Sequence, residues 1–261
     1  VELPGNEGGR TGETYAHYQI FNEATRFIRD NADRPFFCYL PITPPHGMFD
    51  IPEQDPAWAI YKDKEWPLEA RRYAAMVSMV DRQVGEVIAL LKELELDEKT
   101  LVIFCGDNGG NDYFASADSP RGFHAPNVNP QSGVEFRGRK GTLYEGGLRI
   151  PMIARWPGKI EPGQVSDHLW YFPDVMPTFC ELAGVRCPQE SDGISITPEL
   201  LGRPQKQKKH EYLYWELGQQ VAVRMDNWKA VLPRRSDEWE LYELTTDVSE
   251  QNDVSGEHPD I

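Results

Sequence analysis

The sequence is poor in basic residues, has few cysteines and contains no long apolar run. Its 27 lysine and arginine residues are outnumbered by 42 aspartate and glutamate residues, which gives a formal net charge of −15. A surface that follows a phosphate backbone needs clustered positive charge, so this balance argues against general nucleic-acid binding. No apolar stretch reaches the roughly 20 residues that a helix needs to cross a bilayer, and none has the pattern of a signal peptide. We therefore expect neither a nucleic-acid partner nor a membrane span in this sequence.

The four cysteines have neither the spacing of zinc ligands nor a clear disulfide framework. Cys180 and Cys187 can pair across the end of a predicted helix, but we expect free, buried thiols. Cys105 lies in an apolar run and is expected to be a small buried residue rather than a metal ligand. The sequence also has no Asn-x-Ser/Thr sequon, so it gives no support for glycosylation.

A length of 261 residues permits one large domain or two smaller ones, and the order of the segments favours two. From Thr14 to about Gly202, helical and strand-like patterns alternate, which indicates an α/β fold. Beyond the lysine-rich stretch 206–209, short strands and turns follow. We predict an α/β domain over residues 1–205, with a mixed sheet flanked by helices. Residues 206–261 are predicted to form a small α+β subdomain built on an antiparallel sheet.

Three helices and three strands are predicted from periodicity and from helix stop signals. The helices cover Thr14–Asn31, Leu68–Leu94 and a segment from Pro173 to about Gly184. The strands cover 35–41, 101–105 and 149–155. In the long central helix the predicted buried stripe consists of Tyr73, Met76, Val77, Val80, Val84, Val87, Ile88 and Leu91. In the first helix it consists of Ala16, Ile20, Phe21, Ala24, Phe27 and Ile28.

The candidate site begins where the strand 101–105 ends, with Asp107 and Asn108 followed by two glycines. In open α/β sheets, ligands bind just past the carboxyl ends of the strands. Carboxylate and amide oxygens are hard ligands that suit Ca²⁺ or Mg²⁺ better than zinc or copper. The same four residues also describe an ordinary turn. What favours a site is a nearby cation, Lys140, in a glycine-flanked segment that leads directly into another strand.

Other candidates lie in loops. Arg137 and Arg139 lie just before Lys140 and can attract a polyanion, or they can be solvated surface residues. The long segment between Asn108 and Lys140 is rich in glycine, proline, asparagine and serine, and it is predicted to form part of a substrate rim that includes His124. His46, in a turn after the strand 35–41, is either a loop residue or a hydrogen-bond donor to an anion.

Several segments occur together in a specific order along the chain. They are Pro35-Phe-Phe-Cys-Tyr-Leu-Pro41 with Pro45-His46, Gly106-Asp107-Asn108-Gly109, Lys140-Gly141-Thr142-Leu143-Tyr144-Glu145-Gly146-Gly147, Arg149-Ile-Pro, Arg155-Trp156-Pro157-Gly158, Phe172-Pro173-Asp174-Val-Met-Pro177-Thr178, Asp192-Gly193-Ile-Ser-Ile, Ala222-Val-Arg224-Met-Asp-Asn-Trp228-Lys229 and Glu240-Leu-Tyr242-Glu-Leu-Thr-Thr-Asp247-Val-Ser-Glu250-Gln-Asn252. In this order they resemble the second half of a type I sulfatase, a member of the alkaline phosphatase superfamily. The resemblance covers nearly the whole chain and implies a sulfatase-like α/β fold with a small C-terminal subdomain.

The resemblance implies a role for each candidate residue in sulfate ester hydrolysis. Asp107 and Asn108 match metal ligands, usually of Ca²⁺, with Mg²⁺ possible. Lys140 and His46 match residues that contact the sulfate. The family usually has glycine where Arg139 stands, so Arg139 is a weaker candidate for substrate contact. His124 is also a weaker candidate, because a single loop histidine is a weak signal. The substrate implied is a sulfated small molecule or glycan.

The family's most characteristic segment has no match here. That segment reads C-x-P-S-R or C-x-A-x-R, and its cysteine becomes the formylglycine nucleophile; none of the four cysteines begins it. The paired aspartates that complete the family's metal shell also have no match. The resemblance therefore implies a C-terminal portion whose missing N-terminal part supplies the nucleophile, and we expect no turnover by this chain alone. Export to the periplasm or outside the cell is expected, or to the lysosome in a eukaryote.

Two alternatives remain open from the residues. One is a phosphoester hydrolase of the same superfamily, with a similar metal site. The other is a non-catalytic protein that binds sulfated glycans and has lost the nucleophile. Paired kinetics on matched esters distinguish the first from a sulfatase, and calorimetry with sulfated glycans beside an activity assay distinguishes the second.

Overall fold

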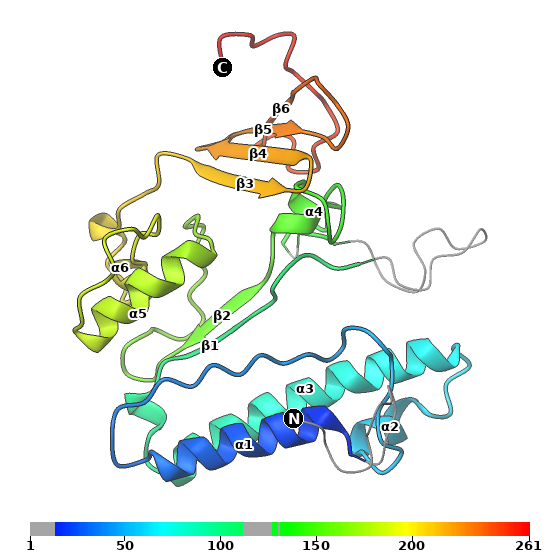
Figure 1. Cartoon of the computed structure of the whole chain (residues 1–261), viewed down its shortest axis with the longest axis vertical. Helices are drawn as coiled ribbons and strands as arrows, with labels where there is room; N and C mark the ends of the chain where they lie inside the picture. Colours follow the sequence, from blue (N-terminus) through cyan, green and yellow to red (C-terminus); the bar gives the residue numbers. More distant parts are fainter. Residues whose placement is uncertain (1–13, 112–126, 130) are drawn as a thin grey trace. The chain divides into compact units, whose positions relative to one another are not determined.

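The computed structural model describes residues 14–111, 127–129 and 131–261. The chain divides into two compact units, one ending at Thr100 and the other beginning at Leu101 (Figure 1). His124 lies outside the described residues. The domain boundary predicted after residue 205 falls inside the second unit and stays a prediction.

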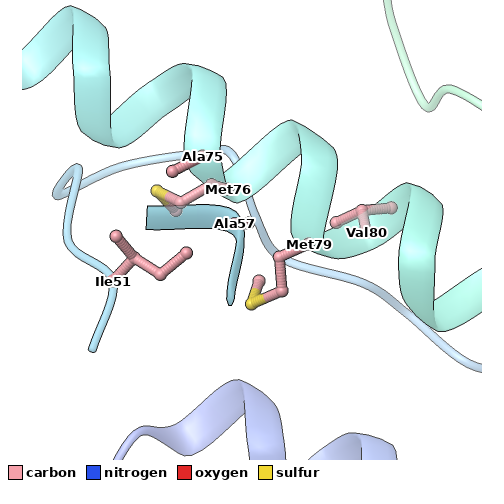
Figure 2. Packing of buried hydrophobic residues seen from close by; sticks show 6 residues of the cluster. All are labelled: Ile51, Ala57, Ala75, Met76, Met79 and Val80. Atoms are coloured by element: carbon pink, nitrogen blue, oxygen red, sulfur yellow. The ribbon is translucent and has the colours of Figure 1, made fainter. Parts of the chain in front are cut away.

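The first unit is helical. Its helices are α1 (Ala16–Asp30), α2 (Pro56–Tyr61) and α3 (Leu68–Glu93), followed by the short 3₁₀ helix η1 (Asp97–Lys99). Asp55 is the N-cap of α2, and its carboxylate accepts a hydrogen bond from the Ala57 amide at 2.8 Å. The predicted helices 14–31 and 68–94 are confirmed to within two residues at each end. The core of the unit lies between α2, α3 and the loop before α2, and contains Ile51, Ala57, Ala75, Met76, Met79 and Val80 (Figure 2).

Three sequence predictions for this unit are wrong in detail. Val77 is 45% exposed, because it lies about 100° around the helix from Met76 and outside the buried face. Ile20 and Phe27 on α1 are 38% and 39% exposed, since the buried side of α1 is centred on His17, Phe21 and Ile28. Residues 35–41, predicted as a strand, form none, because no other described segment pairs with them.

The second unit contains two sheets and three α-helices within the described residues. Its elements are β1 (Val102–Cys105), α4 (Glu145–Leu148), β2 (Met152–Arg155), η2 (Phe172–Asp174), α5 (Val175–Ala183), α6 (Thr197–Leu200), η3 (Pro204–Lys206), β3 (Leu213–Leu217), β4 (Gln220–Met225), β5 (Trp228–Leu232) and β6 (Glu240–Glu243). Strands β1 and β2 pair antiparallel, with Val102 opposite Arg155. The predicted strand 101–105 is confirmed to within one residue, and the predicted strand 149–155 is confirmed over Met152–Arg155. The helix that ends at Gly184 in the left-handed conformation is also confirmed.

The C-terminal sheet is antiparallel, as predicted, and its strand order is β3-β4-β5-β6. Helix α4 and the residues before it lie against this sheet (Figure 1). The contact buries Leu143, Tyr144, Ala222, Val231, Tyr242 and Leu244. This packing attaches the Lys140 segment, which leads into α4, to the C-terminal sheet.

Two further expectations concern the whole chain. All four cysteines are free thiols, but each is only partly buried. No helix in the described ranges has the length and apolar character needed to cross a membrane.

Candidate metal and anion site

The loop after β1 presents oxygen ligands at the end of the strand. The Asp107 carboxylate is exposed and the Asn108 side chain is half-buried. Asn108 Nδ2 donates a hydrogen bond to the Gly109 carbonyl at 2.9 Å, which turns the amide and leaves Oδ1 as the atom that can face a cation. Burial, and then the charge of Asp107, raises the pKa of the Cys105 thiol, so this cysteine stays neutral and is a poor metal ligand.

The same loop packs directly on α4, backbone against backbone. The Gly109 amide donates to the Gly147 carbonyl at 2.9 Å. A Cβ added at Gly109 would lie 1.8 Å from the Gly146 carbonyl oxygen, so no side chain fits there. The glycines of the Asp-Asn-Gly-Gly sequence therefore serve a close approach and not only a turn.

Lys140 belongs to the turn that faces this loop. Its amide donates to the Gly110 carbonyl at 2.8 Å. Gly138 and Gly141 adopt φ of 80° and 85°, which favour glycine and let the chain reverse around Lys140. A Cβ at Gly146 would lie 2.4 Å from the Gly138 carbonyl oxygen, so the turn and α4 are also in close contact. The structure thus joins the Asp107–Gly110 loop to the turn 138–142 that bears Lys140.

The chemistry of these donors fits a hard divalent cation but supplies only part of its shell. Ca²⁺ takes about 6–8 oxygen ligands, whereas Asp107 and Asn108 offer a carboxylate and one amide oxygen. Within the described ranges, no group of three or more histidine, cysteine, aspartate or glutamate side chains is placed to hold a metal ion. The two residues can therefore hold one side of a cation whose remaining ligands lie elsewhere.

Two other candidates have different surroundings. His46 belongs to the first unit, where it is exposed in a turn closed by its own amide, which donates to the Thr43 carbonyl at 2.9 Å. Arg139 is exposed beside Lys140, and its amide donates a hydrogen bond to the Thr142 hydroxyl oxygen at 3.1 Å.

Arg137 has a different role from the one suggested by its position in the sequence. Its guanidinium lies 4.0 Å from the centre of the Tyr144 ring and 3.2 Å from the Glu240 carboxylate. It also donates to the Tyr242 hydroxyl and to the Glu250 carbonyl. Arg137 therefore ties the turn to the C-terminal sheet through its ion pair with Glu240.

A buried cluster of charges lies beneath α4, and sequence reasoning missed it. Lys229 Nζ lies 2.9 Å from Glu145 Oε1 and 2.8 Å from Glu250 Oε1, and its side chain has no exposed surface. Glu145 Oε2 also accepts a hydrogen bond from Arg149 Nε at 2.9 Å and lies 3.8 Å from Arg224 Nη1. We call Glu145, Lys229 and Glu250 the buried triad. One signal in the sequence could have found it. Side chains along β5 alternate between the two faces of the sheet, and Lys229 lies on the buried face with Val231.

The two acids of the buried triad differ electrostatically. Burial alone would raise the pKa of Glu145, but Lys229 and the two arginines lower it to about 2. Burial raises the pKa of the Glu250 carboxyl group, although its ion pair with Lys229 acts in the opposite direction. Glu145 is therefore the firmly ionised member, held between three cations.

Replacing Gly109 by alanine tests the close packing of the loop on α4. The added Cβ would force apart the Gly109 and Gly146 backbones, so we expect the free energy of unfolding to fall by about 1–3 kcal/mol or more. Denaturant unfolding measures the change. Gly85→Ala is the control, because nothing lies within 4 Å of an added Cβ in the middle of α3, and alanine there should stabilise by up to about 1 kcal/mol. Equal stability of Gly109→Ala and the unchanged protein would contradict the packing described here.

Comparisons with known proteins identify relatives of the chain. The family model described as Sulfatase matches residues 4–185. A second model, described as N-sulphoglucosamine sulphohydrolase, C-terminal, matches residues 138–260. A protein named Sulfatase from Formosa agariphila is 32% identical, over 88% of this chain and 44% of its own length. N-acetylgalactosamine-6-sulfatase of the dog, Canis lupus familiaris, is 30% identical, over 95% of this chain and 44% of its own length.

A solved structure also resembles nearly the whole chain. The crystal structure of Ps i-CgsB in complex with k-i-k-neocarrahexaose matches with a TM-score of 0.74 at 28% identity, over 97% of this chain and 54% of that one. The α/β fold class is thereby confirmed. The chain spans about 44% of the length of the two curated relatives described above.

Proposed function

The chain belongs to the sulfatase family, and we propose that it supplies part of the active site of a sulfuric ester hydrolase. The observation that carries the proposal is the bonded pair of loops, in which Gly109 and Gly110 connect the Asp107–Asn108 ligands to the Lys140 turn. That arrangement provides oxygen ligands for a cation and a lysine for an anion on two joined segments. The substrate is an aryl or carbohydrate sulfate ester. The N-acetylgalactosamine-6-sulfatase relative supports the carbohydrate class.

Each residue has a distinct role in the proposed reaction. A divalent cation, when bound, neutralises negative charge on the sulfate oxygens. Asp107 and Asn108 hold one side of that cation. The Lys140 ammonium stabilises charge on the sulfate during the reaction. His46, by its resemblance to the family's histidine, donates a hydrogen bond to a sulfate oxygen or a proton to the departing alcohol.

The nucleophile and the remaining metal ligands are proposed to come from a segment that precedes Val1 in the complete protein. Two observations support this: no formylglycine segment is present in the sequence, and the relatives are more than twice as long as the part matched. Calcium and formylglycine are the cofactors that the family resemblance favours. We further propose that the complete protein is exported, to the periplasm, outside the cell or to a lysosome.

Reading the gene upstream of Val1 tests this division of the site. A segment C-x-P-S-R or C-x-A-x-R is expected there, together with the paired aspartates of the metal shell. A serine or threonine at the nucleophile position would favour a phosphoester hydrolase instead, since sulfate and phosphate are both tetrahedral anions. A native start at Val1 would contradict the proposal and favour a protein that binds sulfated glycans without turnover.

A further inference from the structure

The segment that begins with the Lys140 turn is bound at its C-terminal end by the buried triad. Glu145 is the first residue of α4, and its side chain and backbone are both bound by residues that are distant in sequence. Its carboxylate meets Lys229 of β5, 84 residues away, and its amide donates to Glu250 Oε2 at 2.7 Å, 105 residues away. The exposed fractions of Lys229 and Glu250 are both 0%.

Glu250 is held in an unusual backbone conformation. Its φ of 53° lies in the left-handed region, which residues other than glycine, asparagine and aspartate rarely adopt. Such strain persists only where surrounding contacts enforce it, and it clusters at functional sites. Here the contacts are the ion pair with Lys229, the bond to the Glu145 amide, and the bond from Arg137 to the Glu250 carbonyl.

From the buried triad, an unbroken path of close contacts leads to Lys140. Glu145 fixes the start of α4, and the next two residues, Gly146 and Gly147, contact the candidate site. Gly147 accepts the Gly109 amide, and the Gly146 amide donates to the Arg137 carbonyl at 2.8 Å. Lys140 is then held by Gly110 of the same loop as Gly109.

Stability alone does not account for the buried triad. Removing two charges from water is costly, and well-packed apolar residues in place of a buried ion pair are often neutral or stabilising. Apolar side chains would, however, hold α4 with less directional precision than an ion pair and a backbone bond on the same residue. Burying these charges costs desolvation free energy, but it fixes the orientation of α4.

The geometry points to a positioning role for the buried triad: from the C-terminal sheet, it fixes the turn 138–148 so that the Lys140 ammonium is held where the sulfate binds. This inference rests on the proposed function for its catalytic consequence. Glu145, Lys229 and Glu250 touch neither substrate nor metal. They act through Lys140, and the C-terminal sheet thereby becomes part of the catalytic apparatus.

Hydrogen exchange tests the structural half of the inference without requiring activity. We define the triad variant as Lys229→Met with Glu250→Gln, which removes one charge of each sign and leaves Glu145 paired with its two arginines. In the complete protein, amides in 137–148 should exchange at least about ten times faster in this variant, while those of β3 and β4 are unchanged. The matched control is Arg29→Met with Glu93→Gln, which removes an exposed ion pair and should change neither region.

A double-mutant cycle on sulfate ester hydrolysis tests the catalytic half. The triad variant should lower kcat by about 10–100-fold, the range seen when a supporting residue is lost. In a Lys140→Ala background the same change should have little further effect, because the two act through one group. If the triad only stabilised the fold, the two losses in kcat would instead multiply.

Each combination of results either supports or overturns the inference. Faster exchange in 137–148 together with non-multiplicative kinetics supports the inference. Unchanged exchange, or losses that multiply, overturns it. If the triad variant does not fold, Glu250→Gln alone keeps the Lys229–Glu145 pair and should show the same changes in smaller amount; no change in either measurement would overturn the inference. Absence of sulfate release by the unchanged complete protein would refute the proposed function, while the exchange result would still decide whether the triad fixes the turn.

Discussion

Replacing Lys140 by alanine in the complete protein is expected to lower kcat for sulfate ester hydrolysis by about 10²–10³-fold. This is the loss typical of removing one preorganised group that stabilises charge in the transition state. Alanine keeps the backbone amide that donates to Gly110, so the turn should remain in place and only the ammonium is lost. Steady-state kinetics on an aryl sulfate measure the change, and His46→Ala should give a loss of similar size.

The control for Lys140→Ala is Lys159→Ala. Lys159 is an exposed lysine in the turn that follows β2 of the same unit, and its removal should leave kcat unchanged. Rates within twofold of the unchanged protein for both Lys140→Ala and His46→Ala would exclude both residues from the site.

Replacing Asp107 by alanine should act on the metal before it acts on the rate at saturation. Even residues that only orient a metal ligand cost about 10–100-fold in metal affinity, so the loss of a direct carboxylate ligand should raise the calcium concentration for half-maximal activity by at least about 100-fold. Excess calcium should restore part of the activity. Calcium titration of the hydrolysis rate gives both numbers.

Asp167→Ala is the matched control for the metal prediction. Asp167 is exposed in the same unit, so its loss removes one negative charge without removing a proposed ligand. An unchanged calcium dependence in Asp107→Ala, or an equal shift in Asp167→Ala, would show that Asp107 is not a ligand.

The sequence was sufficient where the deciding interactions are local. The helix 68–94 follows from its apolar periodicity, and the end of α5 at Gly184 follows from a glycine in the left-handed conformation. Asp107, Asn108 and Lys140 stand out because glycines and strands flank them. Their backbone contact through Gly109 and Gly110 is a tertiary feature that the sequence did not predict.

The sequence was insufficient where a residue depends on partners far along the chain. Residues 35–41 have the composition of a strand, but a strand also needs a neighbouring strand to bond with, and composition does not identify that neighbour. Lys229 and Glu250 look like ordinary charged residues until the 84- and 105-residue separations to Glu145 are closed by folding. The contacts of Arg137 with Glu240 and Tyr242 on β6 were not predicted for the same reason.

The central claim is that this chain carries one part of a sulfate ester site and needs upstream residues to complete it. It is tested most directly by measuring calcium-dependent sulfate release from an aryl sulfate, side by side for the 261-residue chain and for the protein extended upstream of Val1, with the matched aryl phosphate as a second substrate. We predict sulfate release by the extended protein alone, faster than its release of phosphate. Turnover by the 261-residue chain, or a preference of the extended protein for the phosphate ester, would contradict the account.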